Sequence, residues 1–350
     1  MKTDKNMKLL YQYAHGYNFS EFELLFRKME PETPSEVFWE AYLMRAQLKL
    51  YTTDLTMLDD FAKAAEGHGM SQFPPLVNNW KSDGLNHFVV FPKTHGHLKK
   101  FVSLLPTVRE KLSCWYGSQT DIVLMQLQSE ILYFIGDIEK ALPLAELQRT
   151  ISGTHIDAIL ALILKFRCYL ALMQTKKAEQ CMFDIIRHSK TYPECVGIYR
   201  EFRCWANLTT GWCGDSPRFC EDEHGKKRPV LQDRLEGIRL GIAKNSTNES
   251  HIIEYAKNNY KDIYTMREYY MDWFHAMYWL SVDDTKQTEV YFHKIYEVTV
   301  ASGIVMPIIE CGAQSLPVLE YIKSIASELP LDEFKHRSAH YENCLNAYRS

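Results

Sequence analysis

The stretch EILYFIGDIEKALPLAELQRT, which runs from Glu130 to Thr150, decides the fold class. Its first half has the hydrophobic spacing of an amphipathic helix, and Gly136 and Asp137 interrupt that spacing before a second helix begins. Ala141 lies early in the second helix, where a methyl side chain lets two helices approach closely. Because a short turn makes successive helices antiparallel neighbours, we expect a tight antiparallel helix pair here.

The same helical spacing extends in both directions along the chain. Apolar residues recur every three or four positions over 121–135, 156–173, 178–186 and 263–280. Short polar segments, such as 152–154 and 282–285, separate these stretches. The pattern therefore predicts consecutive helices that pack against each other in chain order.

Degenerate copies of the first helix pair occur elsewhere. They are CYLALMQTKKAEQCMFDII with Ala178, YWLSVDDTKQTEVYFHKIY, and AYLMRAQLKLYTTDLTMLDDFAKAA with Ala46. The spacing of Ala141 and Ala178 is close to the ~34-residue period of tetratricopeptide repeats. We predict an all-α protein, a right-handed superhelix of stacked antiparallel helix pairs that resembles a tetratricopeptide array. HFVVFP, from His87 to Pro92, is the one segment that looks like a strand, although it could equally be a helix end.

One long interruption divides the chain. GWCGDSPRFCEDEHGKKRPV, from Gly211 to Val230, contains Gly, Pro and both signs of charge, and it has no period. We expect an N-terminal helical array over 1–212, an irregular loop over 213–230, and a C-terminal array over 231–350 that is continuous with the first.

Composition restricts the compartment and the class of partner. The formal net charge of -4 gives no basic surface for direct nucleic-acid binding. DAILALILKF, the most apolar segment, is far shorter than the ~20 residues of a membrane span, and the first residues lack the apolar run of a signal peptide. The nine cysteines are scattered, which is typical of reduced thiols. We predict a cytoplasmic protein without membrane contact.

Sequence patterns for metal binding and catalysis are weak. Cys195, Cys204, Cys213, Cys220 and His224 cluster, but their spacings are wider than the close pairs typical of zinc sites. Buried or surface thiols are the favoured interpretation, and a structural metal is the alternative. GxSxG, HExxH and GxGxxG patterns do not occur. We therefore predict no metal, no cofactor and no enzymatic activity.

ASGIVMPIIECGAQSLPVLEYI, from Ala301 to Ile322, and the irregular repeats from about Glu36 to Ala301 carry a family resemblance. Together they resemble the helical sensor region of large LuxR-family transcription regulators of the maltose-activator (MalT-like) type. In that family a small residue, Pro-Phe or Pro-Ile, an acidic residue, Gly and a Leu-rich helix close the array. A final helix similar to FKHRSAHYENCLNAY follows.

The resemblance implies a role for only one part of such a regulator. A GxxxxGK[ST] phosphate loop does not occur, and no helix-turn-helix pattern follows the final helix, so we expect neither the nucleotide-hydrolysing module nor the DNA-binding module. In the family, this region binds a small inducer or a regulatory protein and controls self-association. The expected partners are therefore a small-molecule inducer or a protein, with a homo-oligomer as a further possibility.

The expected binding surface is the concave side of the superhelix, which the first helix of each pair lines. Polar groups interleaved with aromatic rings suit a small ligand or a partner helix. The residues that this register places there are Glu40, Gln47, Gln126, Glu130, Tyr133, Arg167, Tyr270 and Trp273. Two alternatives stay open, namely that Tyr270 and Trp273 belong to the core and that Glu130 and Arg167 form an ordinary ion pair between helices.

Three functional hypotheses follow. The first is a sensor or interaction module of a LuxR-type regulator. The second is a free-standing scaffold that holds a peptide or helix of a partner in its groove. The third, an enzyme on a helical-repeat frame, has the least support, because no constellation of catalytic residues is recognisable.

Overall fold

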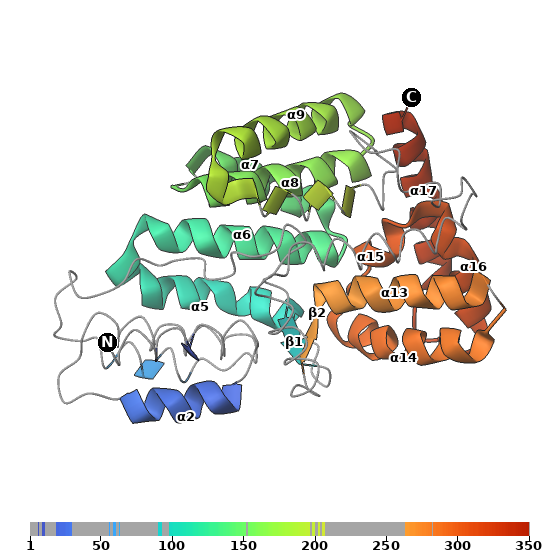
Figure 1. The fold of residues 1–350 in the computed structure, drawn as a ribbon, viewed down its shortest axis with the longest axis horizontal. Helices are drawn as coiled ribbons and strands as arrows, with labels where there is room; N and C mark the ends of the chain where they lie inside the picture. The colour runs from blue at the N-terminus through green and yellow to red at the C-terminus, as the bar shows by residue number, and fades with distance from the viewer. Residues whose placement is uncertain are drawn as a thin grey trace, which may run out of the picture.

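The computed structural model describes most of the chain from residue 98 onward. The described residues are 19–29, 90–92, 98–151, 153–196, 263–281 and 283–349, with isolated positions 6, 9, 10, 56, 59, 60, 63, 198, 199, 202, 203, 205 and 206. These residues are predominantly helical, which confirms the all-α class (Figure 1). Within them, no helix has the length and apolarity needed to cross a membrane.

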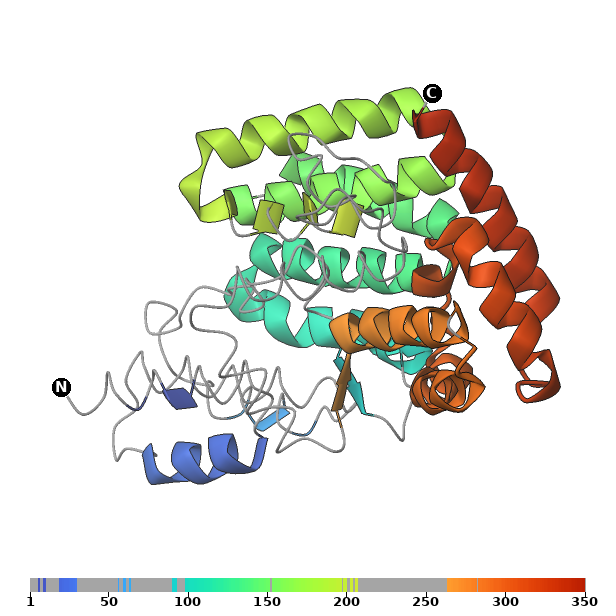
Figure 2. The same cartoon turned by 45° about the vertical axis from the view of Figure 1, so that its right-hand side comes forward.

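The first group of helices packs in chain order. It consists of α2 (Phe19–Met29), α5 (Leu98–Tyr116), α6 (Ser118–Phe134), α7 (Ile138–Ile151), α8 (His155–Ala171) and α9 (Thr175–Thr191), followed by the 3-10 turn η2 (Pro193–Cys195). From α5 to α9 each helix packs on the next, and their axes run side by side in Figures 1 and 2. The predicted stripes over 121–135, 156–173 and 178–186 correspond to α6, α8 and α9.

The second group lies beside the first. Its elements are α13 (Met266–Ser281), α14 (Thr285–Ser302), α15 (Met306–Ile309), η4 (Gly312–Ser315), α16 (Leu316–Tyr321), η5 (Ile322–Ser324) and α17 (Leu331–Arg349). We call residues 303–325, which contain the short helices α15 and α16, the closing segment. The long helix α17 packs on this segment and also reaches α8 and α9, so it spans both groups (Figure 2).

A two-stranded ribbon joins the groups on one side. Strand β1 (Val90–Pro92) pairs antiparallel with β2 (Ile263–Thr265), with Val90 opposite Thr265 and Pro92 opposite Ile263. The strand-like interpretation of HFVVFP is thus confirmed for its last three residues. The prediction that the helical stripe begins at Ile263 is wrong, because the β-branched residues of β2 pair with β1 and the helix begins only at Met266.

Three helix pairs share one type of turn. At Gly136 (φ +84°), the amide of Gly136 donates to Tyr133 and the amide of Asp137 donates to Leu132. This pair of backbone hydrogen bonds defines a Schellman motif, which needs one residue in the left-handed region. The same pattern recurs at Met173 (φ 56°) after α8 and at Asp283 (φ 60°) after α13. The α6–α7, α8–α9 and α13–α14 turns therefore share one backbone conformation.

The small residues expected between paired helices are buried. Ala141 of α7 and Ala178 of α9 have no exposed surface, which agrees with close helix approach at both positions. Between them, α8 is buried on nearly all sides, including Ile159, Ile163 and Phe166. Helix α8 is consequently the centre of the first group.

Gly136 offers a test of how the two groups are joined. A Cβ at this position would collide with the guanidinium of Arg337, whose Nη2 donates to the Gly136 carbonyl at 3.2 Å. Gly136→Ala should therefore lower the free energy of unfolding by ~1 kcal/mol through backbone strain and by about 1 kcal/mol more through displacement of Arg337, as measured by urea unfolding. In an Arg337→Ala background the second contribution should disappear, and its persistence would contradict the assignment.

Candidate functional site, a buried Arg167–Glu310 centre

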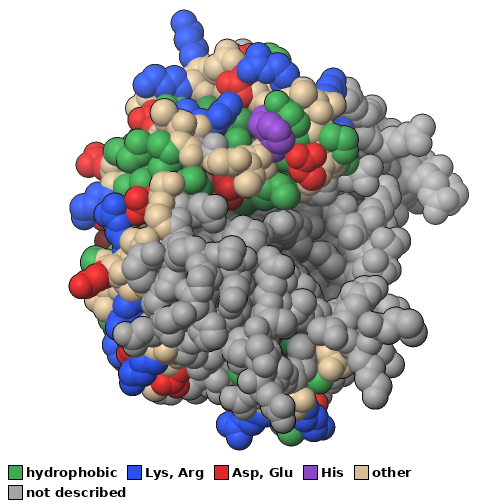
Figure 3. All heavy atoms as spheres, turned by 90° about the vertical axis from the view of Figure 1, so that its left-hand side faces the viewer, with side chains coloured by type: hydrophobic (Ala, Val, Ile, Leu, Met, Phe, Trp, Pro, Cys, Tyr) green, Lys and Arg blue, Asp and Glu red, His purple; other side chains and the backbone are tan. Residues whose placement is uncertain are grey.

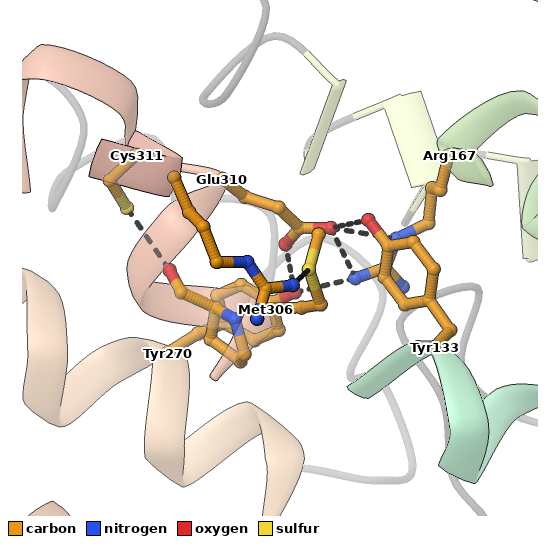
Figure 4. A network of polar contacts seen from close by, with 8 residues as sticks. Tyr133, Arg167, Tyr270, Met306, Glu310 and Cys311 are labelled. Atoms are coloured by element: carbon orange, nitrogen blue, oxygen red, sulfur yellow. Dashed lines mark hydrogen bonds and ion pairs between the residues drawn. The ribbon is translucent and has the colours of Figure 1, made fainter. Parts of the chain in front are cut away.

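A carboxylate from the closing segment lies at the centre of the molecule. The Oε1 atom of Glu310 accepts hydrogen bonds from Arg167 Nε at 3.0 Å and Arg167 Nη2 at 2.7 Å, and also from the hydroxyl of Tyr133. Its Oε2 atom accepts from the hydroxyl of Tyr270. Figure 4 shows these side chains converging from α6, α8 and α13 on Glu310. Four donors on one carboxylate make a strongly held anion.

Aromatic rings enclose the guanidinium of Arg167. Its carbon lies 4.5 Å from the ring centroid of Tyr133, 5.0 Å from that of Phe134 and 4.6 Å from that of Trp205. Its Nη2 atom also donates to the Tyr270 hydroxyl at 2.6 Å. A planar, weakly hydrated cation is suited to such a cage, and a lysine ammonium could not make the same set of contacts.

Backbone bonds fix the closing segment around this centre. The amide of Val305 donates to the Phe134 carbonyl at 2.9 Å, directly where α6 ends. On the other side, the Trp273 indole donates to Ser315 Oγ at 3.2 Å, and Ser315 in turn donates to the Ile308 carbonyl at 2.5 Å. The segment on either side of Glu310 is thus anchored to both α6 and α13.

The ion pair is fully buried, since the exposed fractions of the Arg167 and Glu310 side chains are 1% and 0%. Burial alone would lower the pKa of Arg167, but the Glu310 carboxylate beside it outweighs that effect and holds the pKa above its ordinary value. Burial, reinforced by the Glu310 carboxylate, raises the pKa of Tyr133, so its phenol stays protonated and donates. The centre is therefore a buried ion pair enclosed by aromatic rings and protonated phenols.

A hydrogen-bonded series of buried polar side chains runs through the first group of helices. Gln126 Nε2 donates to Glu130 Oε1 at 3.2 Å, and Gln148 Nε2 of α7 donates to Gln126 Oε1 at 3.0 Å. Gln148 also reaches the Asp157 carbonyl at 3.5 Å. This buried chain of amides and one carboxyl runs between α6, α7 and the start of α8.

Glu130 is the unusual member of this chain. Burial raises its pKa to about 8, although the Gln126 hydrogen bond and the nearby Arg167 charge both act to lower it. Its Oε2 atom and the Nη1 atom of Arg167 have no hydrogen-bond partner among the described residues. At neutral pH Glu130 is therefore mainly a neutral acid beside a permanent cation.

The predicted site residues are brought together in part. Gln126, Glu130, Tyr133, Arg167, Tyr270 and Trp273 are all buried within the packed helices, whereas Glu40 and Gln47 lie outside the described residues. The expectation that the α6 residues face away from the core is wrong, because α7, α8 and the closing segment cover that face. The core interpretation of Tyr270 and Trp273 is confirmed. The alternative of an ordinary Glu130–Arg167 ion pair, which the sequence left open, is wrong, because Arg167 pairs with Glu310 instead.

The sequence prediction missed Glu310 and Tyr341. Glu310 is the acidic residue that follows Pro-Ile in the stretch ASGIVMPIIECGAQSLPVLEYI, so the motif indicated its importance but not its partner. Tyr341 of α17 is buried and interacts electrostatically with Arg167 and Glu310, and burial raises its pKa. Its position on a final amphipathic helix carried no such signal.

The predicted cysteine cluster is largely outside the described residues, which include neither Cys204, Cys213, Cys220 nor His224. Cys195 is buried, and its thiol donates to the His155 carbonyl at 3.4 Å. Within the part of the chain that the structure describes, no three His, Cys, Asp or Glu side chains are grouped so that they could hold a metal ion.

The sequence matches no known family model, and no curated protein is significantly similar to it.

Substitutions in the pair test its contribution to the fold. Either Arg167→Met or Glu310→Gln leaves its buried partner without a counter-charge and should lower the free energy of unfolding by about 3–5 kcal/mol. The double variant should cost less than the sum of the two by roughly 1–3 kcal/mol in a double-mutant cycle measured by urea unfolding. The same cycle on the exposed pair Arg187–Asp184 should give a coupling below ~1 kcal/mol, and equal couplings in both cycles would refute the assignment.

Glu130 makes stability depend on pH. Because its pKa is raised from 4.5 to about 8 on folding, the folded chain binds more protons than the unfolded chain between these values. Its contribution to the free energy of unfolding should therefore fall as pH rises through this window, by at most ~1.4 kcal/mol per pH unit. The Glu130→Gln variant lacks the titrating carboxyl, so the free energy of unfolding of this variant, relative to that of the wild-type chain, should increase with pH. Parallel stability curves for the two proteins would show that Glu130 titrates normally.

Proposed function

We propose that this chain is a non-catalytic helical-repeat module that binds a small molecule or a protein partner, as the sensor region of a LuxR-family regulator does. The observation that carries the proposal is the closing segment, whose buried acidic residue, Glu310, is held by Arg167 of the helix stack. This segment contains most of the stretch from Ala301 to Ile322 that carries part of the family resemblance, and its integration into the stack is what a terminal element of a repeat array requires.

The repeated turn supports a right-handed, tetratricopeptide-like superhelix as the architecture of this module. Gly136, Met173 and Asp283 occupy equivalent positions in three helix pairs, and Ala141 and Ala178 sit at equivalent close contacts. Equivalent turns and contacts rotate each pair against the previous one by a similar angle, which produces a superhelix.

A scaffold for a partner peptide or helix is the second candidate. It is favoured by apolar side chains that stay exposed on the first group of helices, including Phe183 of α9 at 59% and Leu147 of α7 at 48%. Figure 3 shows hydrophobic side chains among Lys, Arg, Asp and Glu on the described part of one face. Mixed apolar and charged surfaces of this kind are common in protein–protein interfaces.

Thermal unfolding of the full chain separates these candidates. A panel of sugars, amino acids, nucleotides and small organic acids is added at millimolar concentration. A sensor module should show a rise in Tm of several degrees with one class of compound, because a ligand at 100 times its Kd stabilises by ~2.7 kcal/mol.

The same samples are analysed for chemical change of any compound that raises Tm. An unchanged compound agrees with a binding module, and its turnover would overturn the non-catalytic assignment. If no compound raises Tm and a defined partner helix binds with one-to-one stoichiometry, the scaffold candidate replaces the sensor.

A further inference from the structure

Lys165 is the partly exposed residue in the body of helix α8. From Asp157 to Ala171, every residue of α8 other than Lys165 is buried. Its ammonium lies 5.9 Å from the ring centroid of Tyr169, one turn further along the same helix. A lysine in such a position keeps its charged end toward solvent while its methylene groups cover apolar surface. Lys165 therefore brings a positive charge to the surface between the helices that flank α8.

Side chains from both flanking helices meet Lys165 at Tyr169. Helices α7 and α9 both pack on α8. From α9, the ammonium of Lys177 lies 5.2 Å from the same ring centroid, and from α7 the Glu146 carboxylate accepts the Tyr169 hydroxyl. Arg149 lies three residues after Glu146, and so it is on the same face of α7. We call Glu146, Arg149, Lys165, Tyr169 and Lys177 the α8 seam.

The positive charges of the α8 seam are not matched by negative ones. Within the part of the chain that the structure describes, no ion pair involves Arg149, Lys165 or Lys177. Two ammonium groups close to one ring repel each other, and an anion between them replaces this repulsion with attraction. The seam therefore has the charge arrangement of a site for carboxylate or phosphate oxygens.

Exposed apolar side chains accompany the seam on both outer helices. Leu147 directly follows Glu146 on α7, and Phe183 lies on α9 within two turns of Lys177, and both apolar side chains are largely in contact with solvent. An inorganic anion or a small acid can use only the cations of this surface. A peptide that carries both acidic and apolar side chains can use the cations and the apolar residues together.

We propose that the α8 seam is the docking surface for an acidic, partly apolar segment of a partner protein, whose carboxylates bind the cations of the seam while its apolar side chains cover Leu147 and Phe183. This inference rests on the proposed function, because it assigns a surface and a partner chemistry to the binding module. The surface lies on α7, α8 and α9 and is separate from the buried Arg167–Glu310 centre.

Fluorescence anisotropy of the full-length chain with a labelled peptide tests this surface. The peptide alternates pairs of Glu with pairs of Leu, and the matched control peptide has Gln in place of every Glu. At physiological ionic strength the Glu peptide should bind with a micromolar Kd, and added salt should weaken it because salt screens exposed charges. The Gln peptide should bind about 10-fold more weakly, because it loses several exposed ion pairs.

Substitutions with matched controls locate the peptide on the chain. Lys165→Gln and Lys177→Gln should each weaken binding about 3- to 5-fold. Lys190→Gln removes the same charge from the last turn of α9, ~20 Å along the helix from Lys177, which is beyond the Debye length of ~8 Å, so binding should stay unchanged. Phe183→Ser should weaken binding, whereas Val300→Ser, at an exposed apolar position of α14, should not.

Three results would overturn the docking surface, namely no binding of the Glu peptide, equal binding of the Gln peptide, or equal effects of Lys177→Gln and Lys190→Gln. Inorganic phosphate that displaces the labelled peptide as effectively as unlabelled peptide does would show a simple anion site and overturn the peptide assignment. These outcomes leave the proposed function standing, because that function fails separately if a compound that raises Tm is turned over.

Discussion

The Glu310 carboxylate, taken out of water into the middle of the molecule, is the constraint on which the remaining structure depends. A buried carboxylate must be supplied with donors, and here Arg167, Tyr133 and Tyr270 supply them from three helices. Once Glu310 is fixed, the closing segment on either side of it is fixed, and α17 packs on that segment. Helix α17 then reaches back to the first group, where the thiol of Cys344 donates to the Ala171 carbonyl at 3.8 Å. One ion pair thus positions elements distant in sequence.

Local features of the fold were predictable because they depend only on residues that are close together in the sequence. The Gly136-Asp137 break, the small side chains at Ala141 and Ala178, and the apolar stripes of α6, α8 and α9 follow from helical periodicity and turn chemistry. The start of α13 was not predictable from periodicity. Ile263 fits the helical stripe equally well, but its backbone pairs with Pro92, and pairing between distant strands leaves no local trace.

The site was predictable in membership but not in geometry. Arg167, Tyr133, Tyr270 and Glu130 stood out as polar or aromatic residues on otherwise apolar helices, and all four belong to the buried centre. A helical wheel assigns such residues to a solvent-facing stripe, because it does not know which later segment will cover them. Glu310 lies 143 positions after Arg167, so sequence spacing could not pair them, and the nearer Glu130 was the natural but wrong partner.

The two buried carboxyl groups of this region differ in their partners. Glu310 is held by Arg167, Tyr133 and Tyr270, whereas burial raises the pKa of Glu130 to about 8, so that Glu130 is mainly a neutral acid at neutral pH. Desolvation offsets much of the attraction within a buried ion pair, so the net contribution of the Arg167–Glu310 pair to stability is smaller than the cost of removing one partner alone.

The most direct measurement is side-chain nitrogen NMR of arginine Nε–H groups in the full chain, with Arg167 assigned through an Arg167→Lys variant. If Glu310 holds Arg167 in the interior, the Arg167 Nε–H exchanges with solvent far more slowly than that of the exposed Arg187, and Glu310→Gln abolishes this protection. An Arg167 Nε–H that exchanges as fast as Arg187, or one whose protection survives Glu310→Gln unchanged, would contradict the account.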